Sequence, residues 1–278
     1  MVYVLISVLV VFMVLFAKIM LSPELKYHSF WYKLKSKLFF FIGDFRTISS
    51  LPFVSTEIKE HFKIHFSDIR EGDLLSKPGD VGLHRIKGAW SNAGIPGAFK
   101  HAWIVVDGNK CVEACSDGVV LRDALYPLAT DYAVILRPKD VSEKDIEMAI
   151  KRSKAIVGCH YDANFKFDLE EANDMIEVRD LGRYRSNISA GAFHPAFSCT
   201  ETVGFSWFHK RSALRLFRTS YAGRDAIVAD DFLKMNFDVV WASPNLTEKW
   251  LVARGLHEEG RRKILEWLKD HSTHDGKG

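Results

Sequence analysis

The sequence predicts an α+β fold in which a small antiparallel β-sheet packs against one central helix. Three observations support this class. Asp107, Gly108 and Asn109 separate two runs rich in β-formers at residues 101–106 and 110–115, as in a β-hairpin. A further run of strand character occupies residues 132–136, and helix-start signals occur at Ser142 and Ser198.

Length and composition limit the protein class. The chain has 278 residues, of which 47% are hydrophobic and 26% charged, as in ordinary globular proteins. This length suits one sizeable domain or two small ones. Lys and Arg number 38 against 35 Asp and Glu, for a formal net charge of +3. That excess is too small to indicate a nucleic-acid-binding surface, so no nucleic-acid partner is expected.

The N-terminus predicts a membrane anchor at residues 1–22. Residues 1–17 carry no charge, Lys18 follows, and three more apolar residues precede Ser22. A run of about twenty residues is long enough to span a bilayer, and a lysine near its end can reach the interface. A cleaved signal peptide is the alternative. The sequence disfavours it, because the run has neither a basic start nor a small-residue cleavage site after it.

The basic residues near this run predict the orientation of the anchor. Lys18, Lys26, Lys33, Lys35 and Lys37 come at its end or after it, and no basic residue precedes it. By the positive-inside rule, a single-pass protein with a cytoplasmic C-terminal domain is expected. Residues 23–55 mix these lysines with aromatic residues. This juxtamembrane segment could lie on the bilayer surface or form the first core helix, and the sequence alone favours neither.

The remaining chain is expected to form one domain at residues 56–270, followed by a polar tail at residues 271–278. Residues 72–75 are predicted to form a short strand. Residues 76–99 contain several glycines and a proline and are predicted to form a long loop. Residues 168–192 are also predicted to be mostly loop.

Three helices are predicted in this domain. One begins after Ser142, has an amphipathic pattern and stops at Gly158. A second runs from Cys199 to about Phe217, and a third, also amphipathic, covers residues 247–270.

Cys199 is the first candidate functional residue. Ser198 followed by Glu201 three residues later forms a capping-box motif, which places Cys199 at the first position of its helix. There the helix dipole and the unpaired N–H groups stabilise a thiolate and lower its pKa. An inert packing cysteine would also fit this position.

His101 and Glu113 are the second candidate feature. In the register expected for the hairpin, Trp103 lies opposite Glu113, Val106 opposite Lys110 and His101 opposite Cys115. His101 and Glu113 are then diagonal neighbours on one face. An imidazole oriented by a carboxylate is the base-and-orienter half of a nucleophilic triad, although a slip of one residue in register would separate the two.

An ordered set of short motifs covering roughly residues 66–245 resembles the circularly permuted branch of the NlpC-type papain-like superfamily. The resemblance is strongest to the YiiX-like cysteine hydrolases, and lecithin-retinol-acyltransferase-like proteins are more distant relatives. The motifs are residues 72–75, residues 101–108 followed by 112–114, residues 158–162 with Phe165, residues 197–201, and residues 229–232.

The resemblance implies a permuted papain-like fold and a role for each candidate residue. Cys199 would be the nucleophile, His101 the base, and Glu113 the group that orients His101. Tyr161 matches a recurrent aromatic residue near the family's pocket and would line the substrate site, although a core tyrosine fits equally well. Two features depart from the family pattern. Thr200 stands where relatives often have Ser, and the long segment at residues 76–99 looks specific to this chain.

No metal and no cofactor are expected. The ligand-type residues Cys111, Cys115, Cys159, His160 and His194 have spacings that match no regular metal site. Cys115 is a weaker candidate for the nucleophile, because a position within a hairpin offers no helix dipole to activate it.

The expected function is that of a membrane-anchored cysteine hydrolase or acyltransferase. It would cleave an ester or amide, in a lipid, lipoprotein, isopeptide or cell-wall peptide, through a thioester acyl-enzyme. The alternatives are a catalytically idle, membrane-tethered binding module on the same fold and a structural membrane protein in which Cys199 has no catalytic role.

Overall fold

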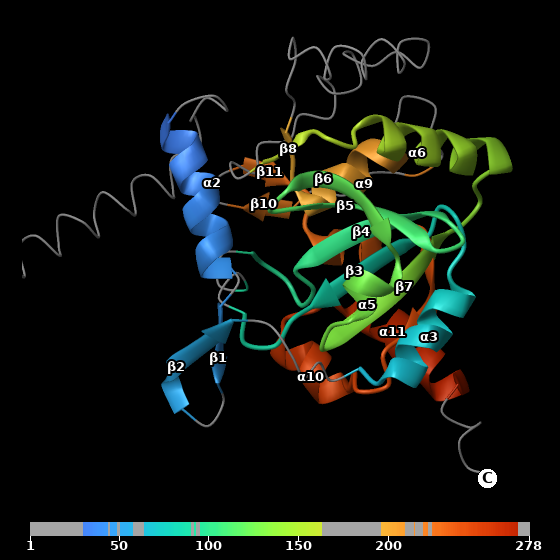
Figure 1. Cartoon of the computed structure of the whole chain (residues 1–278). Coiled ribbons are helices and arrows are strands. Elements are labelled where there is room, and N and C mark those ends of the chain that lie inside the picture. Colours follow the sequence, from blue (N-terminus) through green and yellow to red (C-terminus); the bar gives the residue numbers. More distant parts are fainter. Residues whose placement is uncertain are drawn as a thin grey trace, which may run out of the picture.

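The computed structural model describes residues 30–43, 45–48, 51–57, 64–89, 92, 95–162, 196–208, 214, 219–221 and 224–271. These residues form an α+β fold with a central antiparallel sheet (Figure 1). The predicted fold class is therefore confirmed at this level. The proposed anchor at residues 1–22, the loop at 168–192 and residues 272–278 of the tail lie outside the described residues.

The central sheet has six strands in the described part of the chain. They are β3 (Val81–Arg85), β4 (His101–Asp107), β5 (Lys110–Cys115), β6 (Gly118–Asp123), β7 (Tyr132–Pro138) and β12 (Phe237–Ala242). Their order across the sheet is β12-β7-β3-β4-β5-β6, and every neighbouring pair is antiparallel. Both the predicted hairpin and the predicted strand at 132–136 are part of it.

Helices cover the sheet and extend beyond it. They are α2 (Phe30–Gly43), α3 (Phe66–Leu75), α5 (Leu125–Leu128), α6 (Glu143–Ala155), α9 (Cys199–Trp207), α10 (Glu248–Ala253), α11 (Glu258–His271) and the 3₁₀ helix η2 (Ala229–Lys234). Short strand pairs join β1 (Phe45–Ile48) to β2 (Leu51–Glu57), β8 (His160–Tyr161) to β9 (Ala196–Phe197), and β10 (Thr219–Tyr221) to β11 (Arg224–Ala226). The β8–β9 pair is parallel.

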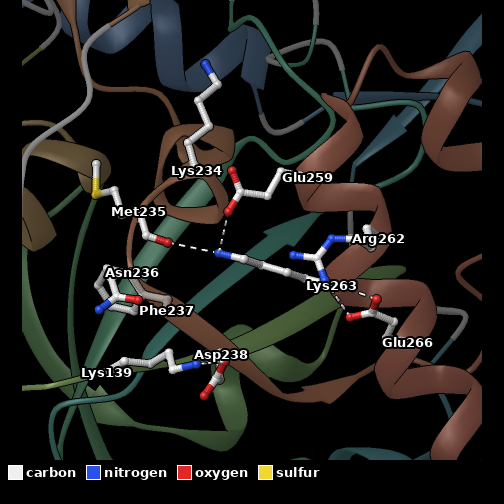
Figure 2. Close-up of a pocket in the computed structure, with 10 residues that line it drawn as sticks. All are labelled: Lys139, Lys234, Met235, Asn236, Phe237, Asp238, Glu259, Arg262, Lys263 and Glu266. Atoms are coloured by element: carbon white, nitrogen blue, oxygen red, sulfur yellow. Dashed lines mark hydrogen bonds and ion pairs between the residues drawn. The ribbon is translucent and has the colours of Figure 1, made fainter.

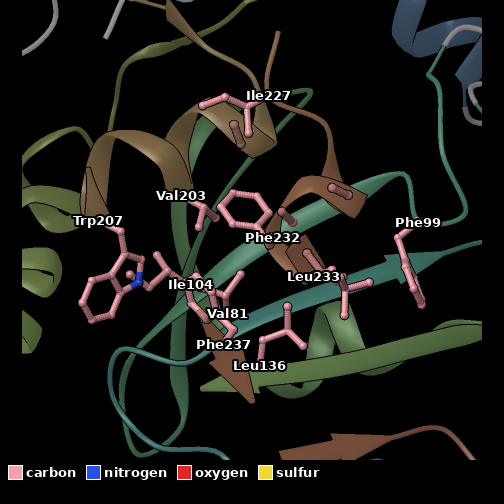
Figure 3. Close-up of a cluster of buried hydrophobic side chains, with 14 of the residues drawn as sticks. Val81, Phe99, Ile104, Leu136, Val203, Trp207, Ile227, Phe232, Leu233 and Phe237 are labelled. Atoms are coloured by element: carbon pink, nitrogen blue, oxygen red, sulfur yellow. The ribbon is translucent and has the colours of Figure 1, made fainter. Parts of the chain in front are cut away.

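The larger hydrophobic cluster lies on the side of the sheet that carries α6, α9 and η2. It includes Val81, Ile104 and Leu136 from the sheet together with Val203 of α9 and Phe232 of η2 (Figure 3). All five side chains are fully buried. The sheet therefore holds the helix that begins at Cys199 by apolar packing, as predicted.

A second cluster lies against α3 and α5. Its sheet residues include Trp103, Ile135 and Trp241, which pack with Ile69 of α3 and Leu128 of α5. Because side chains alternate between the faces of a strand, Ile104 and Trp103 belong to different clusters. The sheet is buried on both faces, and this stiffens the hairpin that carries His101 and Glu113.

Two expectations for residues 72–99 were wrong. Residues 72–75 form the last turn of α3 instead of a strand. The segment 76–99 is not one long loop, since it contains β3 between β7 and β4. Gly82, which suggested a loop, lies where an added Cβ would come within 1.9 Å of the Trp103 ring. Glycine is required at this point by the close approach of an aromatic ring across the sheet.

The hairpin register agrees with the prediction at its functional end. Trp103 pairs with Glu113 as expected. At the turn the prediction was wrong, because Asp107 pairs with Lys110 and the irregularity falls at Val106. The register continues toward His101 and Cys115, but the β4–β5 pairing begins at Trp103, so the expected pairing of His101 with Cys115 stays a prediction. On the other side of β4, His101 pairs with His84 of β3.

The helix ends also differ from the prediction in two places. The first predicted helix, α6, has the expected Ser142 capping box. Helix α9 ends at Trp207, with Phe208 in a non-helical conformation, and so is shorter than predicted. The long helix predicted at residues 247–270 is broken into α10 and α11. Gly255 adopts a φ of 72° between them, a left-handed conformation that glycine accepts readily.

Helix α2 lies within the predicted juxtamembrane segment and packs on the domain. Tyr32 and Lys35 are each 4% exposed, and the Tyr32 hydroxyl donates a hydrogen bond to the carbonyl oxygen of Tyr161. These contacts favour the core-helix interpretation for one face of α2. No helix among the described residues is long and apolar enough to cross a membrane.

Candidate active site

Cys199 is the first residue of α9, as its sequence context predicts. The Ser198 side chain accepts a hydrogen bond from the N–H of Glu201 at 3.4 Å, and the Glu201 carboxylate accepts one from the N–H of Ser198 at 2.6 Å. All three side chains are buried. The reciprocal bonds fix the start of the helix, and with it the position of the thiol.

His101 is the first residue of β4 and contacts both other predicted catalytic residues. Its Nε2 atom lies 2.6 Å from Oε2 of Glu113. Cys199 is its other close neighbour, and each of these two side chains shifts the pKa of the other. The three residues thus form a Cys–His–Glu chain of contacts.

These contacts change the pKa values of the thiol and the imidazole in opposite directions. Burial by itself raises the pKa of Cys199. The charge and hydrogen bond of His101, helped by the N–H groups of Ala102 and Thr200, outweigh burial and lower that pKa. Burial by itself lowers the pKa of His101, but Cys199 and Glu113 raise it to about 10. A thiolate–imidazolium ion pair is the state that these interactions favour near neutral pH.

Arg122 is a member of this network that the sequence analysis missed. Its Nε atom lies 3.0 Å from Oε1 of Glu113, so the carboxylate is held between Arg122 and His101. Its guanidinium also contacts Cys115 Sγ at 3.1 Å. In the register of β6, Arg122 lies opposite Cys111 and hence diagonal to Glu113. This position is visible only once β6 is recognised as a strand, because the pairing of β5 with β6 brings the two side chains together.

His84 is a second residue that the sequence analysis missed. It lies opposite His101 in the β3–β4 pair, and the two rings stack with centroids 4.6 Å apart. Burial, followed by the neighbouring charge of His101, holds the pKa of His84 well below its usual range. His84 is therefore neutral while His101 is charged. Its ring limits the movement of the His101 ring on one side.

Tyr161 is close to Cys199 in the fold, and its role in lining a substrate site stays a prediction. It forms part of β8 and pairs with Phe197, two residues before Cys199. The Tyr161 side chain is buried. Burial, together with the nearby charges of Cys199 and Glu201, raises its pKa well above the usual range. The Tyr161 hydroxyl therefore keeps its proton.

A small groove opens at the thiol. Its walls are mostly apolar and include Ile95, Pro96, Lys100, Ile227 and Val228. The Sγ atom of Cys199 lies 4.0 Å from the Lys100 carbonyl oxygen. The Thr200 hydroxyl donates to the carbonyl oxygen of Ile227 at 2.7 Å and so ties the groove wall to α9. The sequence differs at Thr200 from the family that it resembles, in which Ser is frequent. In this structure Thr200 supports the groove wall.

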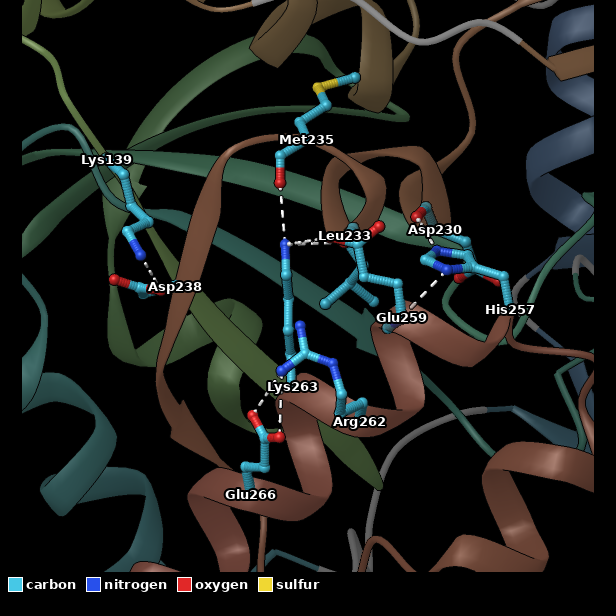
Figure 4. A network of polar contacts seen from close by, with 11 residues as sticks. Lys139, Asp230, Leu233, Met235, Asp238, His257, Glu259, Arg262, Lys263 and Glu266 are labelled. Carbon is cyan, nitrogen blue, oxygen red and sulfur yellow. Dashed lines mark hydrogen bonds and ion pairs between the residues drawn. The ribbon is translucent and has the colours of Figure 1, made fainter.

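Asp230 of η2 holds the chain that leads into β4. Its carboxylate accepts hydrogen bonds from the N–H groups of Ala98 at 2.6 Å and Phe99 at 2.9 Å. Burial raises the pKa of Asp230 to about 6, against the lowering effect of these bonds. His257 contacts the Asp230 carbonyl oxygen at 3.1 Å (Figure 4). These bonds fix the residues immediately before His101.

A larger surface hollow lies between η2, β12 and α11, and it does not include Cys199 or His101 (Figure 2). Most of its charged side chains are paired with each other. Lys139 contacts Asp238 at 3.2 Å, Arg262 contacts Glu266 at 2.9 Å, and Lys263 contacts Glu259 at 3.3 Å. No cysteine, serine or threonine lines this hollow. It is a network of surface ion pairs and is not the candidate active site.

Cys111 and Cys115 do not share the activation of Cys199. Burial raises the pKa of Cys111 to beyond the usual thiol range and also raises that of Cys115. Cys115 is therefore a poor nucleophile despite its contact with Arg122. Within the described ranges, no group of three or more His, Cys, Asp or Glu side chains is arranged to hold a metal ion.

Comparison of the chain with protein-family models, with curated proteins and with solved structures finds no match. The function of this protein is therefore inferred from the contacts among Cys199, His101 and Glu113.

Proposed function

We propose that the protein is a cysteine hydrolase or acyltransferase with a permuted papain-like arrangement, in which Cys199 attacks an ester or amide carbonyl. The observation that carries the proposal is that His101 contacts Cys199 and Glu113 at once. The order of the elements supports the permuted arrangement, because the hairpin bearing His101 and Glu113 precedes the helix that begins with Cys199.

The first half of the reaction forms a thioester. The Cys199 thiolate adds to the carbonyl carbon, and the leaving alcohol or amine takes a proton from the His101 imidazolium as the C–O or C–N bond breaks. Glu113 binds His101 and stabilises the charged imidazole. Arg122 supports Glu113 by neutralising the second carboxylate oxygen.

The second half regenerates the thiolate. Neutral His101 removes a proton from water or from another acyl acceptor, whose oxygen or nitrogen then attacks the thioester carbonyl. Cys199 leaves as the thiolate, and His101 is again protonated. N–H groups at the start of α9, next to the thiol, are the donors that we propose to stabilise the negative charge on the carbonyl oxygen.

The groove suggests the kind of substrate. Its apolar residues, which include Ile95, Pro96, Ile227 and Val228, suit the acyl part of a substrate better than a charged peptide. The uncharged run at residues 1–17 supports a membrane-attached enzyme. A lipid or lipidated ester or amide is therefore the substrate class that we test first.

The rate of alkylation by iodoacetamide, followed at each cysteine as a function of pH, tests the proposal. We expect Cys199 to react at least about tenfold faster than Cys115 at neutral pH, because only its thiol has a lowered pKa. Replacing His101 with Ala should slow Cys199 to the rate of an ordinary buried thiol. Mass spectrometry of the digested protein reports each site separately.

Asn92→Ala is a suitable control, because the Asn92 side chain donates to the Ile86 carbonyl oxygen at 2.7 Å, a bond that involves none of Cys199, His101 and Glu113. If Cys199 titrates like the other cysteines in the wild-type protein, the activated nucleophile does not exist. A binding module without turnover would then replace the enzyme. If Cys199 is activated, release of acyl products from phospholipid, lipopeptide and simple ester substrates should depend on its thiol and stop in Cys199→Ser.

A further inference from the structure

Helix α2 has two unlike faces, and the outer one has no partner among the described residues. The inner face carries Tyr32 and Lys35, each 4% exposed. Phe30 and Trp31 are 70% and 51% exposed, and their rings contact each other edge to face with centroids 5.4 Å apart. Lys33 and Lys37 are also exposed. Phe30 and Trp31 thus form a contiguous exposed aromatic pair, and contiguous apolar patches mark binding surfaces more often than single exposed residues do.

The spacing of these residues places aromatic and lysine side chains together on the outer face of α2. Residues three and four apart lie on one side of a helix, so Phe30, Lys33 and Lys37 share a face and Trp31 lies at its edge. Aromatic rings combined with lysines are the composition of helices that lie in the interface of an anionic bilayer. The rings enter the headgroup region, and the lysines contact lipid phosphates and carboxylates.

We infer that α2 docks the domain on an anionic lipid surface through Phe30, Trp31, Lys33 and Lys37. Two observations favour lipid over a protein partner. The four residues combine aromatic and positive groups without an exposed acid, which matches the charge of an anionic leaflet. The uncharged run at residues 1–17 also ends only a short distance before Phe30 along the chain.

The inner face of α2 connects this surface to the candidate site. The Tyr32 hydroxyl donates a hydrogen bond to the carbonyl oxygen of Tyr161, and Tyr161 pairs with Phe197, two residues before Cys199. Figure 1 shows α2 along one side of the domain. Docking through the outer face would therefore keep the thiol close to the lipid headgroups. The docking surface itself does not depend on the proposed chemistry.

Quenching of tryptophan fluorescence by brominated lipid tests the contact in the full-length chain. The protein is reconstituted in vesicles of phosphatidylcholine with about 30% phosphatidylserine, with and without dibrominated phosphatidylcholine. The chain has seven tryptophans, so the contribution of one is obtained by difference. We expect Trp31→Phe to remove most of the bromine-dependent quenching. Trp250→Phe, a partly buried tryptophan of the core, should leave it unchanged.

Charge reversal tests the role of the lysines. We expect the double variant Lys33→Glu/Lys37→Glu to reduce the quenching by at least about twofold, because its outer face repels an anionic leaflet. The matched control Lys144→Glu/Lys151→Glu changes two exposed lysines of α6 and should behave like the wild type. Raising the salt concentration should weaken quenching in the wild type and in the control.

Two results would overturn the inference. One is a Trp31→Phe protein that is quenched as strongly as the wild type, which would mean that Trp31 faces water or protein. The other is equal quenching with and without phosphatidylserine, which would exclude recognition of an anionic surface. Cys199→Ala should retain the full quenching, so a failure of docking and a failure of the proposed reaction are told apart.

Discussion

At the scale of single residues, the candidate site depends on His101, since its ring joins Cys199 to Glu113. The ring is restrained on several sides. Glu113 binds Nε2 at 2.6 Å, and His84 stacks on its face at 4.6 Å. Arg122 in turn holds Glu113 at 3.0 Å. A charged imidazole is thereby kept in one orientation and in one protonation state near neutral pH.

We expect Glu113→Gln to weaken the activity about 100-fold or more, in the range attributed to a positioned acid–base pair. Glu113 is one of the groups that raise the pKa of His101 to about 10. Loss of Glu113 lowers the pKa of His101. Less positive charge then stands beside the Cys199 thiolate, so the pKa of Cys199 rises. The midpoint of Cys199 alkylation should therefore move to higher pH.

The pH profile of turnover separates this effect from misfolding. In the wild type, the rate should rise as Cys199 deprotonates below its ordinary pKa and fall as His101 loses its proton near pH 10. In Glu113→Gln the rise in rate, set by Cys199, should move to higher pH, and the fall in rate, set by His101, should move to lower pH. Glu147→Gln changes an exposed carboxylate of α6 and is the matched control. An unchanged profile in Glu113→Gln would mean that Glu113 does not orient His101.

At the scale of elements, η2 fixes the chain that enters β4. The Asp230 carboxylate accepts from two buried N–H groups, those of Ala98 and Phe99. Gly97, just before them, has a φ of 96° and lies where a Cβ would come within 2.7 Å of the same carboxylate. The approach to His101 therefore depends on a contact between segments more than one hundred residues apart.

We expect Asp230→Ala to lower the free energy of unfolding by about 2 kcal/mol, because it leaves two buried donors without an acceptor. Burial raises the pKa of Asp230 to about 6. A raised carboxyl pKa means that the contribution of Asp230 is largest below its ordinary pKa of 3.8 and shrinks as the pH rises through 6. The difference between the two proteins should then be larger near pH 5 than near pH 8.

Urea denaturation at the two pH values measures this difference. Asp238→Ala is the control, since the Asp238 side chain is 58% exposed and its ion pair with Lys139 lies at the surface. Its effect should stay below about 0.5 kcal/mol. Equal stabilities of Asp230→Ala and the wild type at both pH values would contradict a structural role for this carboxylate.

At the scale of the whole molecule, stability comes from a sheet that is buried on both faces. The larger cluster joins the sheet to α9, η2 and α11, and the smaller one joins it to α3 and α5. Phe232 of η2 is fully buried in the larger cluster (Figure 3). Changes in this cluster should therefore affect the fold as a unit, including the position of Cys199.

We expect Phe232→Ala to destabilise the domain by roughly 3–5 kcal/mol, because it removes a buried ring and leaves a cavity. Phe66→Ala removes a ring that is 73% exposed and should change the stability by less than about 0.5 kcal/mol. Thermal or chemical denaturation followed by circular dichroism compares the two. Similar losses for both variants would mean that the larger cluster is not the main source of stability.

Local sequence signals determined much of this protein. The capping boxes at Ser142 and Ser198, the β-hairpin and the pairing of Trp103 with Glu113 follow from short-range patterns, and all are present in the structure. These patterns succeed because a helix cap or a tight turn is stabilised by residues that are close in sequence. The position of Cys199 at the start of α9 and the proximity of His101 to Glu113 could be predicted for the same reason.

Only the tertiary structure decided the rest. Residues 76–99 looked like a loop because of their glycines, and Gly82 is explained by the Trp103 ring of another strand. Arg122 and His84 join the site through the β5–β6 and β3–β4 pairings, whose register no local pattern specifies. The break at Gly255 likewise depends on how α10 and α11 pack on the domain. Burial and strand pairing between distant segments, and not local propensity, set these features.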